Sequence, residues 1–560
     1  MTHRQALGAA VVVAAVLASA CGHRIEGKSS KDGLDTARRH IDAFAAAEML
    51  GDDAGGPGET AAMDYVRKHF ETLGLEPVVR TVPLVQMTPT STFARVTAAD
   101  GQPLPLEPAN GKDYLVWAGQ QKAEVSVKSG AIFAGYGIVS PEYKRDDYKG
   151  VDVKGKIVVV LEGSPHTADR DDLGALGESY YGRRFYKFAE GWRQGAAAVL
   201  IVHGGLQSWD EMRQQATGAI IDIEADAINA ESKAAVEGWL SLPAAMRLFG
   251  AARLDFNKQL TQARELAFQP VPLGNLQIEI RLTSTITRTV TRSVVGILRG
   301  QIPEYVMLAS QWNGLPFVPN APAPHEPAAA PVVKGVGMAI IAQEMAPGGR
   351  KADTSREHAS ISGLTGDGSG GAVVLEAARR LVAQRRKPLR NIVFMVASAL
   401  KPGVVALQHW VDHPMFPLNK TVGMVFIDQA SPTEAKQGVG KIGTSSDDAL
   451  SQMARTAAIG QGRLLVLDQN SERRFYYKYG QAAFGSRGVP TIYLTTPPQS
   501  LRRVQAGAPA ATDLNDDAKV EIDPDLDAML LTTLVRRVAD ATNWRPASMS
   551  ATALAAASAR

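Results

Sequence analysis

Four runs of apolar residues in the second half of the chain predict buried strands. They lie within residues 304–311, 391–398, 421–428 and 489–496, and apolar residues fill consecutive positions at their centres. Strands of this kind are typical of sheets covered on both faces. Segments with helical spacing, such as residues 370–384, separate the runs. The pattern predicts an α/β fold with a doubly wound, mostly parallel sheet, in which functional side chains follow the carboxyl ends of the strands.

The first half of the chain has two kinds of segment. Residues 35–75 have apolar positions at helical spacing and predict two helices, the second ending at Gly74. Between about 126 and 275, shorter apolar runs bounded by turn residues predict the strands of a compact insert. Residues 315–332 and the tail 546–560 are too rich in proline, alanine or other small residues to predict a packed element.

The first residues have the pattern of a secretory signal. Arg4 precedes an uncharged apolar run that is short for a membrane span, and small residues end this run before Cys21. The sequence LASAC resembles the bacterial lipobox, and Cys21 is the only cysteine of the chain. The resemblance implies cleavage and acylation at Cys21, and Gly22 after it implies an outer-membrane lipoprotein with its body on the periplasmic face. An ordinary signal peptide or a buried N-terminal helix is the alternative.

The charge of the chain argues against one class of partner. Its 560 residues contain 60 lysines and arginines and 57 aspartates and glutamates. This balance is too even for the basic field that nucleic-acid binding needs, so we expect no nucleic-acid partner. A mature chain that begins at its one cysteine is also expected to contain no internal disulfide.

Three longer stretches carry a family resemblance: GGPGETAAMDYVRKHFETLGLEP (55–77), FAGYGIVSPEYKRDDYKGVDVKGKIVVVLEGSP (133–165) and GDGSGGAVVLEAARRL (366–381). The chain resembles the bacterial zinc aminopeptidases related to the glutamate carboxypeptidases and the transferrin receptor, whose fold carries an inserted, β-rich protease-associated domain. The resemblance covers most of residues 40–545. Together with the lipobox pattern and the composition of the tail, it predicts a signal peptide with lipobox (1–21), a tether (22–34), the N-terminal part of a peptidase-like domain (35–125), a protease-associated insert (126–275), the main part of the peptidase-like domain (276–545) and a disordered tail (546–560).

Active members of that family hold two zinc ions with histidines and acidic residues, and a further glutamate acts as the general base. Imidazole and carboxylate bind zinc at about 2.0 to 2.2 Å, and the free glutamate removes a proton from zinc-bound water. Here the first histidine position is Gln311 and the adjacent acid position is Asn313, with Trp312 between them in the expected cleft. Only Asp367, at the bridging position, and Asp428, at the later aspartate position, match metal ligands.

The glutamates that the family needs are also replaced. Leu400 stands at the general-base position and Lys401 at a metal-binding glutamate position. The residue inventory agrees without any alignment, because no acidic residue lies between Glu376 and Asp412 and no histidine follows His413. We expect the Lys401 ammonium to supply, between the two remaining aspartates, part of the positive charge that zinc supplies in the family.

These substitutions predict a non-hydrolysing pseudopeptidase, a lipoprotein that binds a peptide or protein in the cell envelope and needs no cofactor. The alternative is an active zinc aminopeptidase whose site is rebuilt with His325 and His358, from the stretch between strand and helix. A purely structural scaffold is a third class. A serine nucleophile, Ser369 with Lys401 as base, is a fourth, but the G-x-S-x-G elbow of hydrolases is absent. The sequence identifies neither the ligand nor the oligomeric state.

Overall fold

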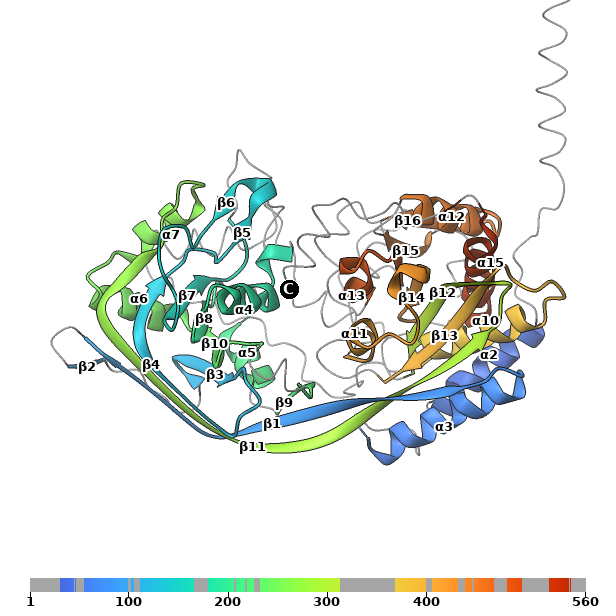
Figure 1. Ribbon diagram of the computed structural model, residues 1–560, viewed down its shortest axis with the longest axis horizontal. Coiled ribbons are helices and arrows are strands. Elements are labelled where there is room, and N and C mark those ends of the chain that lie inside the picture. Colours follow the sequence, from blue (N-terminus) through green and yellow to red (C-terminus); the bar gives the residue numbers. More distant parts are fainter. Residues whose placement is uncertain are drawn as a thin grey trace, which may run out of the picture.

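The computed structural model of the protein consists of two lobes joined by two long strands (Figure 1). It describes residues 31–44, 46, 55–98, 102–104, 111–165, 180–205, 208–216, 219–225, 232–312, 368–398, 405–431, 439–445, 448–467, 481–495, 523–542 and 544. We call the lobe that contains the strands from β12 onward lobe 1 and the lobe that contains β2 to β10 lobe 2.

The two joining strands are β1 (Val78–Thr97) and β11 (Val271–Leu298). They pair antiparallel along almost the whole of β1 and run along the lower edge of Figure 1 from one lobe to the other. Through β11, 15 of the described strands form one continuous sheet that includes strands of both lobes, while β5 and β6 pair in a separate two-stranded sheet. The sequence analysis does not predict either strand. Buried and exposed residues are mixed along both, so no continuous apolar run marks them.

The sheet of lobe 1 is mostly parallel at its centre. Its strands are β12 (Ile302–Gln311), β13 (Arg390–Ala397), β14 (Thr421–Ile427), β15 (Val439–Ser445), β16 (Leu464–Leu467) and β17 (Thr491–Thr495). β12 lies between β13 and β14 and is parallel to both, and β17 continues the parallel set beside β14. Every residue of β13, β14 and β17 is buried, which confirms the predicted α/β fold class with strands covered on both faces.

Helices cover both faces of this sheet. They are α2 (Lys31–Phe44), α3 (Pro57–Thr72), α10 (Ser369–Val382), α11 (Val405–Asp412), α12 (Asp448–Ile459), α13 (Gln481–Ser486) and α15 (Pro524–Asp540), with a 3-10 turn at Leu418–Lys420. Val306 and Leu308 of β12 join one hydrophobic core with residues of α10 and α15. Met307 and Ala309 join another core with residues of α11. Alternate residues of β12 therefore bury on opposite faces, as a doubly wound sheet requires.

Lobe 2 has hydrophobic cores of its own. Its strands are β2 (Pro103–Leu104), β3 (Tyr114–Ala118), β4 (Glu124–Phe133), β5 (Val139–Ser140), β6 (Arg145–Asp146), β7 (Ile157–Leu161), β8 (Ala198–Val202), β9 (Ile220–Ile223) and β10 (Val236–Leu240). Its helices are α4 (Arg184–Arg193), α5 (Trp209–Ala216), α6 (Leu242–Ala251) and α7 (Phe256–Arg264), and two 3-10 turns span Pro141–Tyr143 and Tyr180–Gly182. One core extends from Val96 to Leu282. The assignment of this region as a protease-associated insert, with boundaries at 126 and 275, stays a prediction.

The N-terminal helix pair agrees with the helical spacing in the sequence. α3 ends at Thr72, just before Gly74, and α2 begins at Lys31, inside the stretch expected to be a tether. No helix within the ranges given above has the length and apolar character that crossing a bilayer would require. The predicted signal peptide and lipobox, including Cys21, lie outside the described residues.

Candidate functional site

Glycines let the first turn of α10 approach the carboxyl ends of β12 and β14. A Cβ on Gly370 would collide with the backbone oxygen of Asp428 and with Oγ of Ser310. Gly368, which precedes the helix, has φ of +62°, and a Cβ there would lie 2.6 Å from the backbone oxygen of Trp312. Only glycine fits such close backbone contacts without strain. Gly368 and Gly370 are therefore needed to bring α10 this close to the strand ends.

Ser369 holds the first turn of α10 against the segment that follows β14. Its hydroxyl oxygen accepts a hydrogen bond of 2.9 Å from the backbone N–H of Ala430, and the residue is 1% exposed. The bond ties the start of α10 to the segment that follows β14. This buried structural role replaces the nucleophile alternative considered for Ser369.

Gln311 and Asp428 end two adjacent parallel strands. Ala309 of β12 is in register with Phe426 of β14, so continuing both strands by two residues brings Gln311 beside Asp428. Because side chains alternate along a strand, both lie on the face that carries Ala309 and Phe426. Both are partly exposed. The structure thus brings together two of the residues that the sequence singles out.

Two hydroxyl groups of β17 hold the Asp428 carboxylate. Tyr493 donates to its Oδ2 at 2.6 Å, and Thr495 donates to the same oxygen at 2.9 Å. Hydrogen bonds to an ionised carboxylate are strong and favour the charged form. The sequence analysis does not include either residue. Their spacing in the sequence could have indicated them, because residues two apart on a strand, such as 493 and 495, lie on the same face of the sheet.

Trp312, expected to line the cleft, packs in the hydrophobic core. Its side chain is 2% exposed and belongs to the same cluster as Phe44 of α2 and Ala372 of α10. Its backbone N–H donates to the oxygen of Ala397 at the end of β13, at 3.0 Å. Trp312 therefore anchors the end of β12, and Gln311 is the residue of this pair that reaches the surface.

The remaining predicted site residues cannot be placed, since Asn313, Asp367, Leu400 and Lys401 lie outside the described residues. Within the described ranges, no group of three or more His, Cys, Asp or Glu side chains could hold a metal ion. The donor set at the described strand ends does not fit a two-zinc centre, which requires imidazole and several carboxylates. A carboxamide, Gln311, and one carboxylate already held by two hydroxyls do not supply it.

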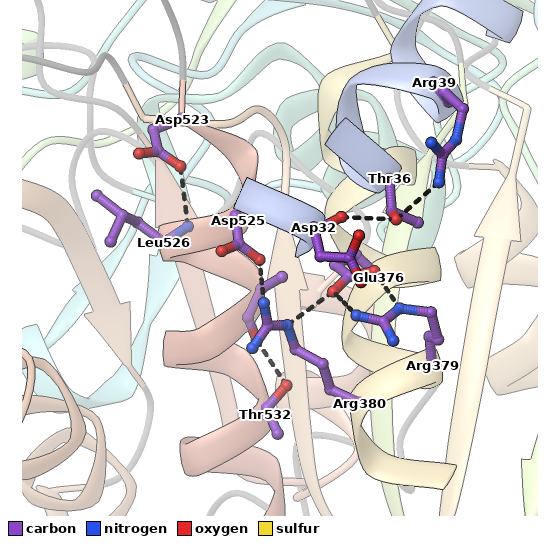
Figure 2. Close-up of polar contacts among 11 residues, drawn as sticks. Asp32, Thr36, Arg39, Glu376, Arg379, Arg380, Asp523, Asp525, Leu526 and Thr532 are labelled. Carbon is purple, nitrogen blue, oxygen red and sulfur yellow. Dashed lines mark hydrogen bonds and ion pairs between the residues drawn. The ribbon is translucent and has the colours of Figure 1, made fainter. Parts of the chain in front are cut away.

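Glu376, the last acidic residue before the acid-free stretch, has a structural role. It is 0% exposed on α10, and both of its oxygens accept from Arg379 at 2.7 Å (Figure 2). Arg380 donates to Oε1 of Glu376 at 2.8 Å and also pairs with Asp525 of α15. The network joins α10 to α15, and its geometry leaves Glu376 unavailable as a general base at the strand ends.

The buried His40 of α2 lies against the half-buried His69 of α3, in the helix layer of lobe 1. Nδ1 of His40 is 2.7 Å from the Tyr65 hydroxyl, and the rings of His40 and His69 are 4.5 Å apart edge to face. Burial, and then the positive charges of His69, Arg39 and Arg379, lower the pKa of His40 to about 3. Burial also lowers the pKa of His69. At neutral pH the His40 imidazole is therefore uncharged, and the two rings pack α2 against α3.

Comparison with known proteins gives a family and several solved structures. The family model described as Peptidase family M28 matches residues 337–523. Structures with an overall likeness include an aminopeptidase from Aneurinibacillus sp. strain AM-1, 15% identical, which covers 94% of this chain and 97% of that one with a TM-score of 0.46. The zinc aminopeptidase BSAP from Bacillus subtilis is 16% identical, with coverage of 92% and 97% and a TM-score of 0.39.

A Peptidase M28 precursor from Shewanella amazonensis SB2B is 14% identical, with coverage of 93% and 98% and a TM-score of 0.39. No curated protein matches the chain significantly. At these identities and TM-scores, the structural likenesses say nothing of this chain's activity. The matched segment includes the GDGSGG sequence, β13, β14 and β17, which build the candidate site. This region of the chain, about a third of its length, is therefore similar to peptidase family M28.

Proposed function

We propose that the protein is a pseudopeptidase, which binds a peptide or protein of the cell envelope at the carboxyl ends of β12 and β14 and does not hydrolyse it. The proposal includes acylation at Cys21, attachment to the outer membrane and a periplasmic body. Nucleic acid is not among the proposed ligands, and no cofactor is needed for binding.

One observation carries the proposal against hydrolysis. No acidic residue occurs from 377 to 411, a stretch that includes all of β13 and the segment after it. β13 ends at Ala397, directly beside Gln311 of β12. No carboxylate in the segment after β13 can therefore act as the general base. Without such a base, nothing there accepts the proton of a metal-bound water.

Gln311 supports the binding part of the proposal. Its carboxamide makes no hydrogen bond with any described residue, is partly exposed and offers both a donor and an acceptor. A peptide backbone presents the complementary C=O and N–H groups. The negative charge of Asp428, fixed by Tyr493 and Thr495, lies beside it and favours ligands with a positive or hydrogen-bond-donating group.

The experiment combines metal content, turnover and binding on the purified full-length chain. We expect no two-zinc occupancy and no hydrolysis of aminoacyl p-nitroanilides with added zinc. We also expect a peptide pulled from a random library to bind the wild type but at least tenfold more weakly to Gln311→Ala. Gln452→Ala is the matched control, since Gln452 is an exposed glutamine of α12 away from the strand ends.

Turnover that a chelator abolishes and zinc restores would establish the alternative, an active aminopeptidase with a rebuilt site. An inactive chain whose peptide binding is the same in Gln311→Ala as in the wild type would favour the structural scaffold instead.

A further inference from the structure

A surface pocket of about 360 Å³ lies at the end of lobe 1 opposite the candidate site. It is bordered by the end of α3, the end of β11 and the segment between α10 and β13. β13 runs away from it, from Arg390 near the pocket to Ala397 beside Gln311. Eight strand residues span about 25 Å, so the pocket is separate from the proposed peptide site.

The floor of the pocket is apolar. Leu75, Ile297, Leu381 and Pro388 line it and are buried. They come from the end of α3, from β11, from α10 and from the segment before β13. The pocket therefore suits a ligand that has a hydrophobic part as well as a polar one.

Its rim is strongly basic. Arg299, Arg385, Arg386 and Lys387 line the pocket and are exposed. The one acidic lining residue, Glu76, lies 3.8 Å from Arg299, and these side chains are 88% and 59% exposed, so this pair is weak. The side chains of the other three make no hydrogen bond or ion pair with any residue that the structure describes. Three adjacent positive charges therefore face solvent without a compensating acid.

The backbone beneath these charges is held in place. Arg536 of α15 donates to the backbone oxygen of Arg386 at 2.7 Å and to that of Lys387 at 3.3 Å. Gln301 also donates to the oxygen of Lys387, at 3.3 Å, and the N–H of Leu389 donates to Asp540 at 2.9 Å. A rigid backbone presents the basic side chains in one arrangement, which lowers the entropy lost on binding.

A simpler function for the basic side chains is to offset the negative end of the α10 dipole, which acts within the last turn of a helix. Arg379 and Arg380 already occupy that last turn and pair with Glu376. The dipole therefore does not account for three further cations beyond the end of the helix at Val382.

We propose that this pocket binds the phosphate group of an anionic lipid, with the basic rim on the headgroup and the apolar floor on the adjoining glycerol and acyl carbons. Guanidinium groups match phosphate oxygens in geometry and charge, and juxtamembrane basic clusters recognise anionic headgroups. The site lies apart from the proposed peptide-binding site, and the choice of a lipid as its ligand rests on the proposed acylation at Cys21.

The course of the chain favours a lipid over a free phosphate. Gly33, in the first turn of α2, lies against the side chains of Arg380 in the last turn of α10 and of Asp525 in the first turn of α15, so α2 starts beside the second half of α10. The ten residue steps from Cys21 to Lys31 span at most about 35 Å. Acylation at Cys21 would therefore keep the pocket end of lobe 1 close to the membrane surface.

Calorimetric titration of the full-length chain with soluble dihexanoylphosphatidylglycerol tests this. We expect saturable binding that weakens with salt and falls at least tenfold in the double variant R385A/R386A. K154A/K156A is the matched control, since it removes two exposed charges from lobe 2 and should change nothing. Dihexanoylphosphatidylcholine, which is zwitterionic, should bind at least tenfold more weakly.

A titration with inorganic phosphate distinguishes a lipid ligand from free phosphate. If inorganic phosphate binds as tightly as the glycerol lipid, the ligand is free phosphate and the lipid proposal is overturned. Equal lipid binding by wild type and R385A/R386A also overturns it. If R385A/R386A has a lowered thermal midpoint, the single exposed substitution Lys387→Glu replaces it in the comparison of lipid binding with the wild type.

Discussion

The Tyr493 hydroxyl donates a hydrogen bond of 2.6 Å to Oδ2 of Asp428, and so joins the last strand of the parallel set to the carboxyl end of β14. Tyr493 is itself 0% exposed and stacks on Phe426 at 5.8 Å between ring centroids. Two protein hydroxyls thus hold the aspartate that the sequence predicts at a metal-ligand position. These hydrogen bonds fix the orientation of the carboxylate.

Tyr493→Phe should lower the free energy of unfolding by about 1 to 3 kcal/mol. The substitution removes one of the hydroxyl donors to this carboxylate. Chemical denaturation at pH 7 measures the change. Tyr305→Phe is the control, because the Tyr305 ring stacks on Phe416 while its hydroxyl bonds to no described residue. Equal stability of Tyr493→Phe and wild type would show that the Asp428 bond contributes nothing.

Glu376→Gln should destabilise the protein by about 2 to 3 kcal/mol. The neutral amide leaves Arg379 and Arg380 without their shared charge partner in a partly buried network (Figure 2). One of the two accepting oxygens also becomes an NH₂ group, which cannot accept a hydrogen bond from an arginine. The control is Glu71→Gln, because Glu71 forms an exposed 2.5 Å pair with Arg67 and its loss should leave the stability almost unchanged. Similar shifts of the two thermal midpoints would contradict the structural role assigned to Glu376.

The strands of lobe 1 could be predicted because burial on both faces makes their sequences continuously apolar. β12, β13 and β14 agree with the predicted runs to within two residues at either end. β1 and β11 could not be found this way. Exposed residues interrupt the apolar ones along both strands, and β1 also contains Pro83 and Pro89, which weaken any strand signal.

The candidate site could be predicted only in part. Gln311 and Asp428 could be placed from the sequence, because each stands at the carboxyl end of a continuous apolar run that predicts a buried strand. The burial of Trp312 depends on helices α2 and α10, which pack on it from segments far away in the sequence. Tyr493 and Thr495 were missed because hydrogen bonds across neighbouring strands depend on strand order, and the apolar runs do not give that order.

Stability should fall as the pH is lowered from 6.5 toward 3, through His40. Its pKa is about 3 in the folded protein and 6.5 ordinarily, so between these values the unfolded chain binds a proton that the folded chain does not. At pH 5 the expected loss is about 2 kcal/mol. His40→Gln should flatten the dependence of unfolding free energy on pH between 5 and 6.5. Above pH 7.5, where neither state binds the proton, wild type and variant should differ by a constant amount. An unchanged slope in the variant would mean that other groups cause the acid sensitivity.

Cys21→Ala should move the protein from the membrane fraction to the soluble fraction, because the acyl chains are the proposed anchor and the body is held only weakly by its basic pocket. Mass spectrometry of the wild-type N-terminus should find a diacylglyceryl group on Cys21. Retention of Cys21→Ala in the membrane at high salt, or an unmodified N-terminus elsewhere, would refute the lipoprotein proposal.

Gln311→His should not create aminopeptidase activity, even with zinc added. The substitution supplies one imidazole beside Asp428, which could raise affinity for a metal ion. Hydrolysis also needs a general base, and no carboxylate is present from 377 to 411 to serve as one. The informative comparison is therefore between metal binding, measured by calorimetry, and turnover of aminoacyl p-nitroanilides. A gain in zinc affinity without turnover agrees with loss of the base. Turnover by Gln311→His alone would mean that a residue outside the described ranges supplies the base, and the pseudopeptidase proposal would then be wrong.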